Sequence, residues 1–281
     1  MVSIVLTAYN AETTIERAIL SCINQTLKDI EIIIVNDFSN DNTLNIIQHY
    51  CNKDSRIKLI NHNINKGAGL SRRRGIEHIK GDWMVFLDSD DYLKNDCLEV
   101  LLNNALQSNV DIVCPGYIKV SSNEKILEIK IPKEKIIQSD KQKFQNNLED
   151  TKHFMNPMLI KSSIWKNVTY SSRRFIEDIP TLVQILYYAK SILLLNYTGY
   201  YYTQNKNSLI HSASQIKYKI FSLLSLKDMF IFFKSKGNNL STTEFCIEYE
   251  KLLNLDIEDE EYELYKNELD ELYDYYLTIT K

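Results

Sequence analysis

Three aspartates within four residues form a dense group of side chains capable of chemistry: Asp88, Asp90 and Asp91. An isolated aspartate has a pKa of about 3.9, so three neighbouring carboxylates repel one another at neutral pH. Mg²⁺ and Mn²⁺ prefer carboxylate oxygens. Alternate side chains of an extended segment point the same way, so Asp88 and Asp90 can share one ion. The cluster predicts a Mg²⁺ or Mn²⁺ site, although aspartates are also common turn and capping residues.

Polar groups follow three other apolar runs in the first hundred residues in the same manner. These groups are Thr7–Asn10, Asn36–Asp41, and Asn65–Gly67 continuing to Arg72–Gly75. In an open parallel sheet, ligands bind outside the carboxyl ends of the strands. If each apolar run is a strand of such a sheet, all four polar groups lie at one edge. That edge is the predicted binding site.

The segments that must position these groups alternate between short apolar runs and amphipathic stretches. The apolar runs suit strands buried on both faces. The stretches 15–23 and 98–106 have the spacing of amphipathic helices. Thr13 and Glu16 form a predicted capping box at the start of the first stretch. The expected strands are Val2–Leu6, Glu31–Val35, Ile57–Ile60, Trp83–Leu87 and Val110–Cys114. Strands alternating with helices predict an α/β fold with a mostly parallel, Rossmann-like sheet flanked by helices.

The pattern changes after residue 115. The pattern predicts a hairpin formed by Tyr117–Val120 and Ile126–Ile131. It also predicts an irregular segment at residues 133–156 and another strand at Ile192–Asn196. A helix is expected to begin at Pro180, which suits a first helical position. Only helices are expected beyond residue 215, where residues 256–274 hold ten acidic side chains and one lysine. This helical C-terminal appendage is expected to pack on the core or on a second subunit, which would make a homodimer.

Composition narrows the classes of protein. The chain has 281 residues, a formal net charge of −4 and five scattered cysteines without a C-x-x-C pair. These features favour neither nucleic-acid binding, a disulfide framework nor a zinc site. The strand-like start and the lack of an eighteen-residue apolar run predict neither a signal peptide nor a membrane span. We therefore expect a cytoplasmic protein, with residues 216–236 forming either a membrane-surface helix or a packed helix with snorkelling lysines.

Three segments of this sequence resemble the inverting family 2 glycosyltransferases, which have the GT-A fold: Val2–Asn10, Ile34–Thr43 and Val85–Asp91. Asn65–Gly75 is similar to the third motif of the family, and Glu177-Asp178 to its acidic pair. The resemblance extends from residue 2 to about residue 210, with the motifs in the family's order. Two departures stand out: Asn36 replaces a usual acidic residue, and Ser71-Arg72-Arg73-Arg74 replaces the usual Ala-Arg-Asn, so which arginine enters the site stays open.

The resemblance implies three regions and a role for each motif. Residues 1–115 would bind the nucleotide-sugar, residues 116–214 the acceptor, and residues 215–281 would form the helical C-terminal region. Asp37 would contact the nucleobase, which is expected to be uracil. The other donor-binding residues would be Thr7, Ala8, Tyr9, Arg72, Asp88 and Ser89. Asp90, with Asp88, would bind the metal, and Asp178 would be the general base. His211 lies in a loop that often closes over the diphosphate, and it is a further candidate for metal or phosphate contact.

The implied function is transfer of a hexose from a UDP-sugar to the hydroxyl of a glycan or lipid-linked acceptor. Its implied setting is bacterial surface polysaccharide or glycolipid synthesis at the cytoplasmic face of the membrane. A catalytically inactive nucleotide-binding or assembly partner with the same fold is one alternative. A transferase acting on nucleic acid is another, favoured by Arg72–Arg74 and Arg173-Arg174 and disfavoured by the net charge. A nucleotidyltransferase would need a glycine-rich basic loop where Ala8–Asn10 stands.

Overall fold

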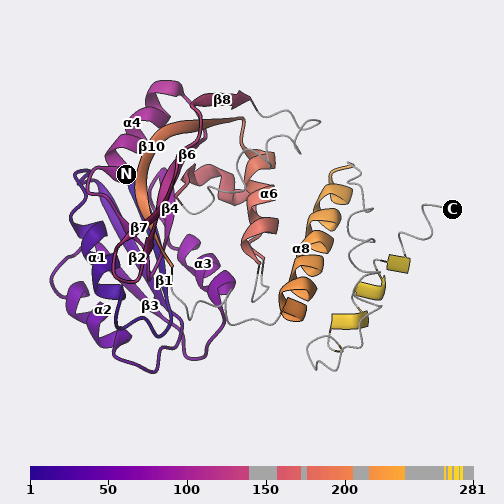
Figure 1. The fold of residues 1–281 in the computed structure, drawn as a ribbon, viewed down its shortest axis with the longest axis horizontal. Helices are drawn as coiled ribbons and strands as arrows, with labels where there is room; N and C mark the ends of the chain where they lie inside the picture. The colour runs from indigo at the N-terminus through magenta and orange to yellow at the C-terminus, as the bar shows by residue number, and fades with distance from the viewer. Residues whose placement is uncertain are drawn as a thin grey trace.

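The structure is a computed structural model, and it describes residues 1–138, 157–171, 176–204 and 215–237, together with parts of a helix between residues 263 and 274. The first ninety residues alternate strand and helix, as the apolar runs predict. The elements are β1 (Val2–Ala8), α1 (Ile15–Ile23), β2 (Ile30–Asn36), α2 (Thr43–Cys51), β3 (Ile57–Asn61), α3 (Ala68–Ile76) and β4 (Trp83–Asp88). Figure 1 shows these strands side by side, with α1 and α2 on one side of them and α3 on the other.

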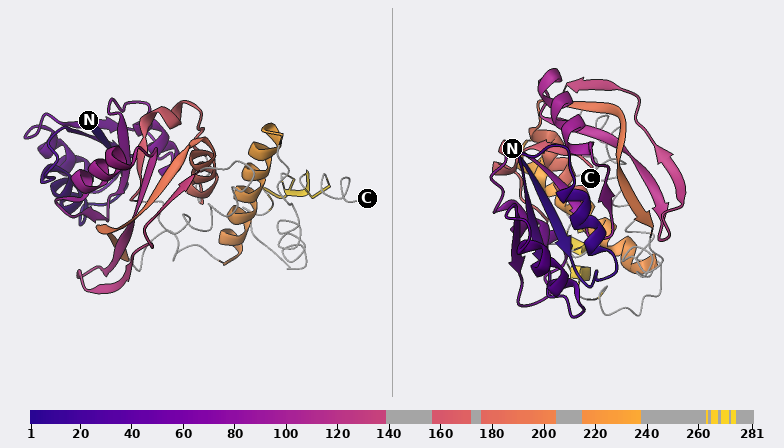
Figure 2. Two further views of the ribbon diagram at one scale, coloured as in Figure 1. Left: turned by 90° about the horizontal axis from the view of Figure 1, so that it is seen from above. Right: turned by 90° about the vertical axis from the view of Figure 1, so that its left-hand side faces the viewer.

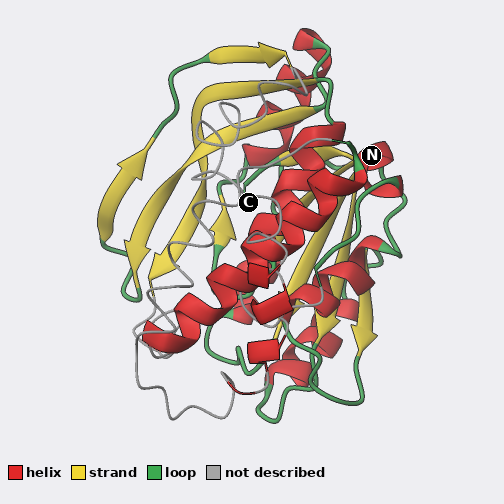
Figure 3. Ribbon diagram, turned by 90° about the vertical axis from the view of Figure 1, so that its right-hand side faces the viewer, coloured by secondary structure: helices red, strands yellow, loops and turns green. Residues whose placement is uncertain are grey.

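The second part of the sheet is built from shorter and more varied elements. They are β5 (Tyr92–Leu93), α4 (Cys97–Ser108), β6 (Ile112–Ser121), β7 (Ile126–Lys130), β8 (Lys135–Gln138), β9 (Leu159–Lys161), the 3₁₀ turn η1 (Ser162–Lys166), α6 (Asp178–Tyr188), β10 (Ser191–Gln204) and α8 (Gln215–Ser235). The predicted hairpin forms, with β6 and β7 antiparallel. Figure 2 shows it in magenta, extending away from the helices, and Figure 3 shows the long strands curving past the helical layer.

One sheet joins all of these strands in the order β3-β2-β1-β4-β9-β6-β10-β5, with β7 on β6 and β8 on β10. The strands β3, β2, β1 and β4 are parallel, and so are β6 and β10. The predicted α/β class with a central, mostly parallel sheet is therefore confirmed. The chain moves outward from β1 to β3 and then returns to place β4 on the other side of β1. This reversal is a topological switch point, where α/β sheets bind ligands.

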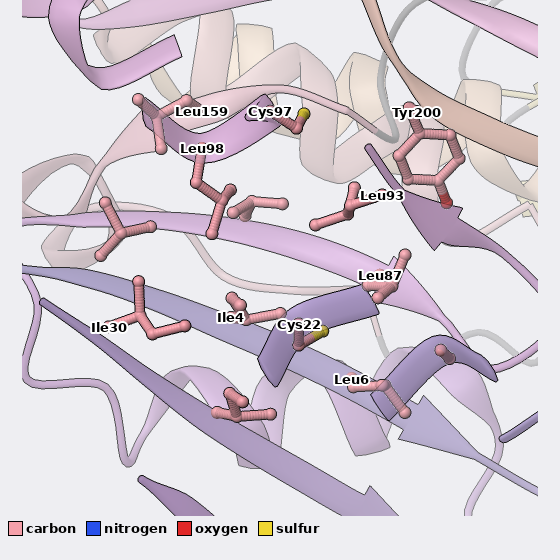
Figure 4. Close-up of a cluster of buried hydrophobic side chains, with 14 of the residues drawn as sticks. Ile4, Leu6, Cys22, Ile30, Leu87, Leu93, Cys97, Leu98, Leu159 and Tyr200 are labelled. Carbon is pink, nitrogen blue, oxygen red and sulfur yellow. The ribbon is translucent and has the colours of Figure 1, made fainter. Parts of the chain in front are cut away.

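Side-chain alternation along β1 determines which helices cover which face. Val2, Ile4 and Leu6 are buried with α1, α2 and α4, whereas Val5 is buried on the opposite face with α6 and α8. Figure 4 shows Ile4 and Leu6 in the first cluster, together with side chains of other strands and helices. Because successive strand residues point to opposite faces, a strand covered on both sides is apolar throughout. This explains the continuous apolar runs.

Several local predictions differ from the structure. The N-cap of α1 is Thr14, without a side-chain cap bond, and Glu16 instead accepts a 2.7 Å hydrogen bond from the Tyr50 hydroxyl, so the predicted capping box is wrong. The helix α6 begins at Asp178, which makes Pro180 its third residue. The segment 133–156 is expected to be irregular, but β8 lies near its start, and residues 139–156 lie outside the described residues. The strand β10 is more than twice as long as the predicted Ile192–Asn196.

The helix α8 packs against α6 (Figure 1). It buries apolar side chains on several sides, among them Ile220, Leu224 and Phe233, and even Lys227 is largely buried. This burial fits the packed-helix interpretation of residues 216–236 rather than a helix lying on a membrane. Across the described ranges, the length and apolarity needed to cross a bilayer are not found together in any helix.

Candidate active site at the switch point

The carboxyl ends of β1, β2 and β4 bring the predicted site residues into one row. Thr7 is paired with Val35 on one side and with Asp88 on the other, and Ala8 is paired with Asn36. This register means that the residues after these strands emerge at the same edge of the sheet. The structure therefore places the polar groups that follow β1, β2 and β4 together, as the sequence predicts.

The loops after β1 and β2 are hydrogen-bonded to each other. The Asp37 amide donates to the Ala8 carbonyl at 2.8 Å, and the Asn10 amide donates to Ser39 Oγ at 3.1 Å. In return, the Asn40 amide donates to Asn10 Oδ1 at 2.9 Å. The two loops therefore form one unit around Tyr9, whose side chain is exposed.

Asp37 is the first residue of the loop after β2, and it is almost completely buried. Its Oδ1 accepts hydrogen bonds from His62 Nδ1 and from the Lys66 amide, both at 2.8 Å, and its Oδ2 accepts one from the Gly67 amide at 2.7 Å. Gly67 has a φ of 86°, a backbone conformation that favours glycine. Asp37 thus anchors the segment that leads into α3. The prediction that it contacts a nucleobase stays a prediction.

His62 is a site residue that sequence reasoning did not single out. It is buried, and its Nδ1 lies 2.8 Å from Asp37 Oδ1. The signal was present: His62 directly follows the third strand, at the edge where Asp37 follows the second. A polar residue at that position belongs to the same row of strand ends.

Arg72 settles which arginine of the third motif turns inward. Its Nη2 lies 2.6 Å from Asp88 Oδ1, and its Nη1 lies 2.6 Å from Glu177 Oε1. Arg73 and Arg74 are on the outside of α3, where both contact Glu77. The helix can carry Arg72 this close because Gly75 packs on β1, where an added Cβ would overlap the Val5 side chain. Arg72 therefore joins the strand end of β4 to the start of α6.

The three clustered aspartates have different environments. Asp91 is buried and accepts hydrogen bonds from the Thr203 amide at 2.7 Å and from the Tyr200 hydroxyl. Burial raises the pKa of Asp91 well above its usual value, and the nearby carboxylates of Asp90 and Asp88 raise it further. Asp91 is thus directed at β10, whereas Asp88, Ser89 and Asp90 stay partly exposed at the sheet edge.

Arg17 supports the same loop from α1, and sequence reasoning did not single it out. Its Nη2 donates to the Asp90 carbonyl at 2.7 Å and to Thr203 Oγ1 at 2.9 Å. Its guanidinium also lies over the Tyr92 ring, 4.4 Å from the centroid. The backbone at Asp90 is therefore fixed through Arg17 on one side and through Asp91 on the other.

The oxygen ligands at this edge fit a hard divalent cation that takes most of its other ligands from outside the protein. Among the described residues, no group of three or more His, Cys, Asp and Glu side chains is arranged to hold a metal ion. The edge offers the carboxylates of Asp88 and Asp90, and Asp88 also contacts Arg72. Mg²⁺ sites commonly use one or two carboxylates and complete their coordination with water and substrate phosphates. His211, the further candidate, lies outside the described residues, as do Arg173 and Arg174.

The acidic pair stands at the first turn of α6. Ile176 precedes it with a φ of 54°, and the Glu177 carbonyl accepts a 2.8 Å bond from Thr181 Oγ1. Burial raises the pKa of Asp178, against the lowering effect of Arg72, and Asp88 contributes to the rise. Burial also raises the pKa of Glu177 to about 6, although Arg72 opposes it. Two neighbouring carboxylates with raised pKa values beside a strand-end cluster are typical of a functional site.

The raised pKa of Glu177 predicts a measurable pH dependence of stability. An acid whose pKa is higher in the folded protein than in the unfolded chain binds its proton more tightly when folded. The free energy of unfolding therefore falls as the pH rises from about 4.5 to about 6, by roughly 2 kcal/mol from this group. Urea denaturation of the wild type and of Glu177→Gln between pH 4.5 and 7.5 measures this loss as a difference between the two proteins. Parallel pH profiles would contradict the assigned pKa.

Comparison with known proteins supports the resemblance of the motifs. The family described as Glycosyl transferase family 2 matches residues 3–168. An uncharacterized glycosyltransferase of Haemophilus influenzae is 42% identical over 117 residues, which are 42% of this chain and 47% of that protein. The cholesterol galactosyltransferase of Borreliella burgdorferi is 31% identical over 251 residues, which are 84% of this chain and 68% of that protein. The chain thus spans about half to two thirds of these relatives.

Solved structures identify the fold. The crystal structure of residues 1–349 of Staphylococcus aureus TarS superposes with a TM-score of 0.64 at 19% identity, covering 90% of this chain and 70% of that one. The same TarS fragment in complex with UDP gives a TM-score of 0.62 at 20% identity, with the same coverage. The predicted GT-A fold is confirmed. Given the family match over more than half of its length, this chain belongs to glycosyl transferase family 2.

Proposed function

We propose that the chain transfers a hexose from a UDP-sugar to an acceptor hydroxyl, with inversion at the anomeric carbon and with Mg²⁺ or Mn²⁺. The observation that carries this proposal is the double ion pair of Arg72, which holds Asp88 and Glu177 at 2.6 Å each. It brings the acidic pair of α6 beside the strand ends that would hold the donor. The TarS structures, one with UDP and one with UDP-GlcNAc, support a uridine nucleotide as the donor.

The residues at the carboxyl edge of the sheet are proposed to have different roles, according to their environments. Asp88 and Asp90 would hold the cation, which when bound supplies Lewis-acid stabilisation of a leaving diphosphate. Thr7, Ala8, Tyr9, Asp37 and Ser89 would line the nucleotide site. Arg72 contacts both Asp88 and Glu177, and it would act on the donor by orienting Asp88. Asp178 would accept the proton of the attacking hydroxyl, because its raised pKa makes it a better base than an exposed aspartate.

The acceptor is proposed to be a glycan or a lipid-linked molecule of a bacterial surface polymer or glycolipid. The name of the Borreliella burgdorferi relative, cholesterol galactosyltransferase, supports a lipid-borne hydroxyl. A setting at the cytoplasmic membrane face with peripheral contact, and a homodimer through the C-terminal helices, belong to the same proposal. The nucleic-acid alternative loses support, because Arg72 is buried and both Arg73 and Arg74 contact Glu77.

Calorimetric titration with UDP, GDP, CDP and ADP, each with and without Mn²⁺, tests the proposal. We expect tight binding of UDP that requires the cation, and no comparable binding of the other three nucleotides. Preference for another nucleotide would overturn the uridine assignment and keep the transferase. Absence of metal-linked binding for all four would favour the inactive assembly partner.

A further inference from the structure

The strained residue at the end of β2 points to a function that the proposed chemistry does not use. Phe38 has a φ of 61°, in the left-handed region. A bulky side chain there is a conformational outlier, whereas glycine and asparagine enter this region readily. Strained residues of this kind persist where the surrounding structure holds them, and they cluster at functional sites. The strain at Phe38 therefore suggests that its phenyl ring has a functional role.

The ring is not used to build the core. Its exposed fraction is 44%, and within the described part of the chain Phe38 belongs to neither hydrophobic cluster. The preceding residue, Asp37, is buried and anchored by three donors. The left-handed turn therefore joins a buried, fixed carboxylate to an exposed aromatic ring.

A second exposed aromatic ring stands on the facing loop. Tyr9 is 48% exposed, and the next residue, Asn10, also has a left-handed φ, of 47°. Asn10 bonds Ser39 and Asn40, the two residues after Phe38, at 3.1 and 2.9 Å. Two left-handed turns, each beside an exposed ring, are thus cross-linked at the strand ends. This linkage holds the strained turn in place without a ligand.

Asp37 indicates the kind of ligand that suits this place. A carboxylate has about four acceptor positions, and three are taken, two on Oδ1 and one on Oδ2. Among the described residues, no donor is assigned to the second position on Oδ2, which can accept one N–H from a ligand. A flat heterocycle with one ring N–H matches both the remaining acceptor and the neighbouring aromatic surface. Uracil has this chemistry.

We propose that Phe38 is a specificity-determining residue whose ring stacks on the nucleobase of the donor. This inference rests on the proposed nucleotide site and adds to it a contact that discriminates base-bearing ligands from diphosphate alone. Stacking of a base on an aromatic side chain commonly changes affinity by about tenfold or more on alanine substitution. The strain at Phe38 then represents stability given up for donor binding.

The test uses Phe38→Asn, because asparagine tolerates the left-handed turn and lacks the ring. We expect the Mn²⁺-dependent affinity for UDP to fall by about tenfold. The affinity for inorganic diphosphate with Mn²⁺ should stay within about twofold, and the Tm should be equal or about 2–4 °C higher. Phe38→Tyr retains the ring and should retain UDP affinity. Leu106→Asn, which removes a side chain that is 62% exposed on α4, is the matched surface control.

The outcomes separate this inference from the proposed function. Unchanged UDP affinity in Phe38→Asn, with the wild type binding UDP normally, overturns the stacking role alone. An equal loss of UDP and diphosphate affinity also overturns it, because the ring would then act through the loop and not through the base. A wild-type protein that binds no nucleotide overturns both.

Discussion

Replacement of Asp90 by alanine is expected to abolish the metal-dependent binding of UDP. Asp90 is one of two partly exposed carboxylates at the switch point, and its backbone is fixed through Arg17 and through the buried Asp91. Asp88 alone, already engaged by Arg72, is a poor site for a divalent ion. Calorimetry with UDP and Mn²⁺ should show no cation-dependent component. The variant should fold normally, because Asp90 is not buried.

Asp82→Ala is the matched control for that experiment. Asp82 lies at the opposite end of β4 with a side chain that is 86% exposed and 3.8 Å from the N-terminal amine. It should bind UDP and Mn²⁺ like the wild type. Cation-dependent UDP binding that survives in Asp90→Ala would show that the aspartate cluster is only a turn.

Replacement of Asp178 by asparagine is expected to leave donor binding intact and to remove transfer. Asparagine preserves the size of the side chain and its hydrogen bond with the Ile179 amide, which is 3.0 Å in the wild type. It cannot accept the proton of the attacking hydroxyl. General-base catalysis is typically worth about 10²–10⁴-fold, so kcat should fall by that factor. Release of UDP from the donor selected by calorimetry provides the assay.

Two comparisons make this prediction specific. Asp29→Asn neutralises a carboxylate whose side chain is 72% exposed, at the N-terminal end of the molecule, and it should retain full activity. The UDP dissociation constant of Asp178→Asn should match that of the wild type, since the base acts on the acceptor. Turnover at the wild-type rate would remove Asp178 as the base. A loss of UDP binding would instead assign it to the donor site.

The core of the fold could be predicted because the central strands have covering helices on both faces. Their apolar runs are continuous, so β1, β2 and β4 appear in the sequence nearly at their true lengths. The position of the site residues could be predicted by the same reasoning, because parallel strands end at one edge of the sheet. The short elements β5 and β8 could not be found, because strands of two and four residues are too short to show a recognisable period.

The contacts that fix the site were harder to predict because they join distant parts of the chain. Thr203 bonds Asp91 across 112 residues and Arg17 across 186 residues, and no local pattern encodes such a pair. The burial of Arg72 was easier to predict from the sequence. Gly69, Arg72 and Gly75 share the buried face of α3 at helical spacing. A single charge on an otherwise small-residue face indicates a buried ionic partner.

The double ion pair of Arg72 also constrains how enzymes of this architecture can be recombined. A chimaera joined near residue 115 would take Arg72 and Asp88 from one parent and Tyr170 and Glu177 from the other. Arg72 contacts all three of these partners. Loss of Glu177 would leave a buried guanidinium short of a countercharge, a defect that typically costs about 3–5 kcal/mol. Swapping the second half, the part proposed to bind the acceptor, is therefore expected to succeed only between parents that match at these four positions.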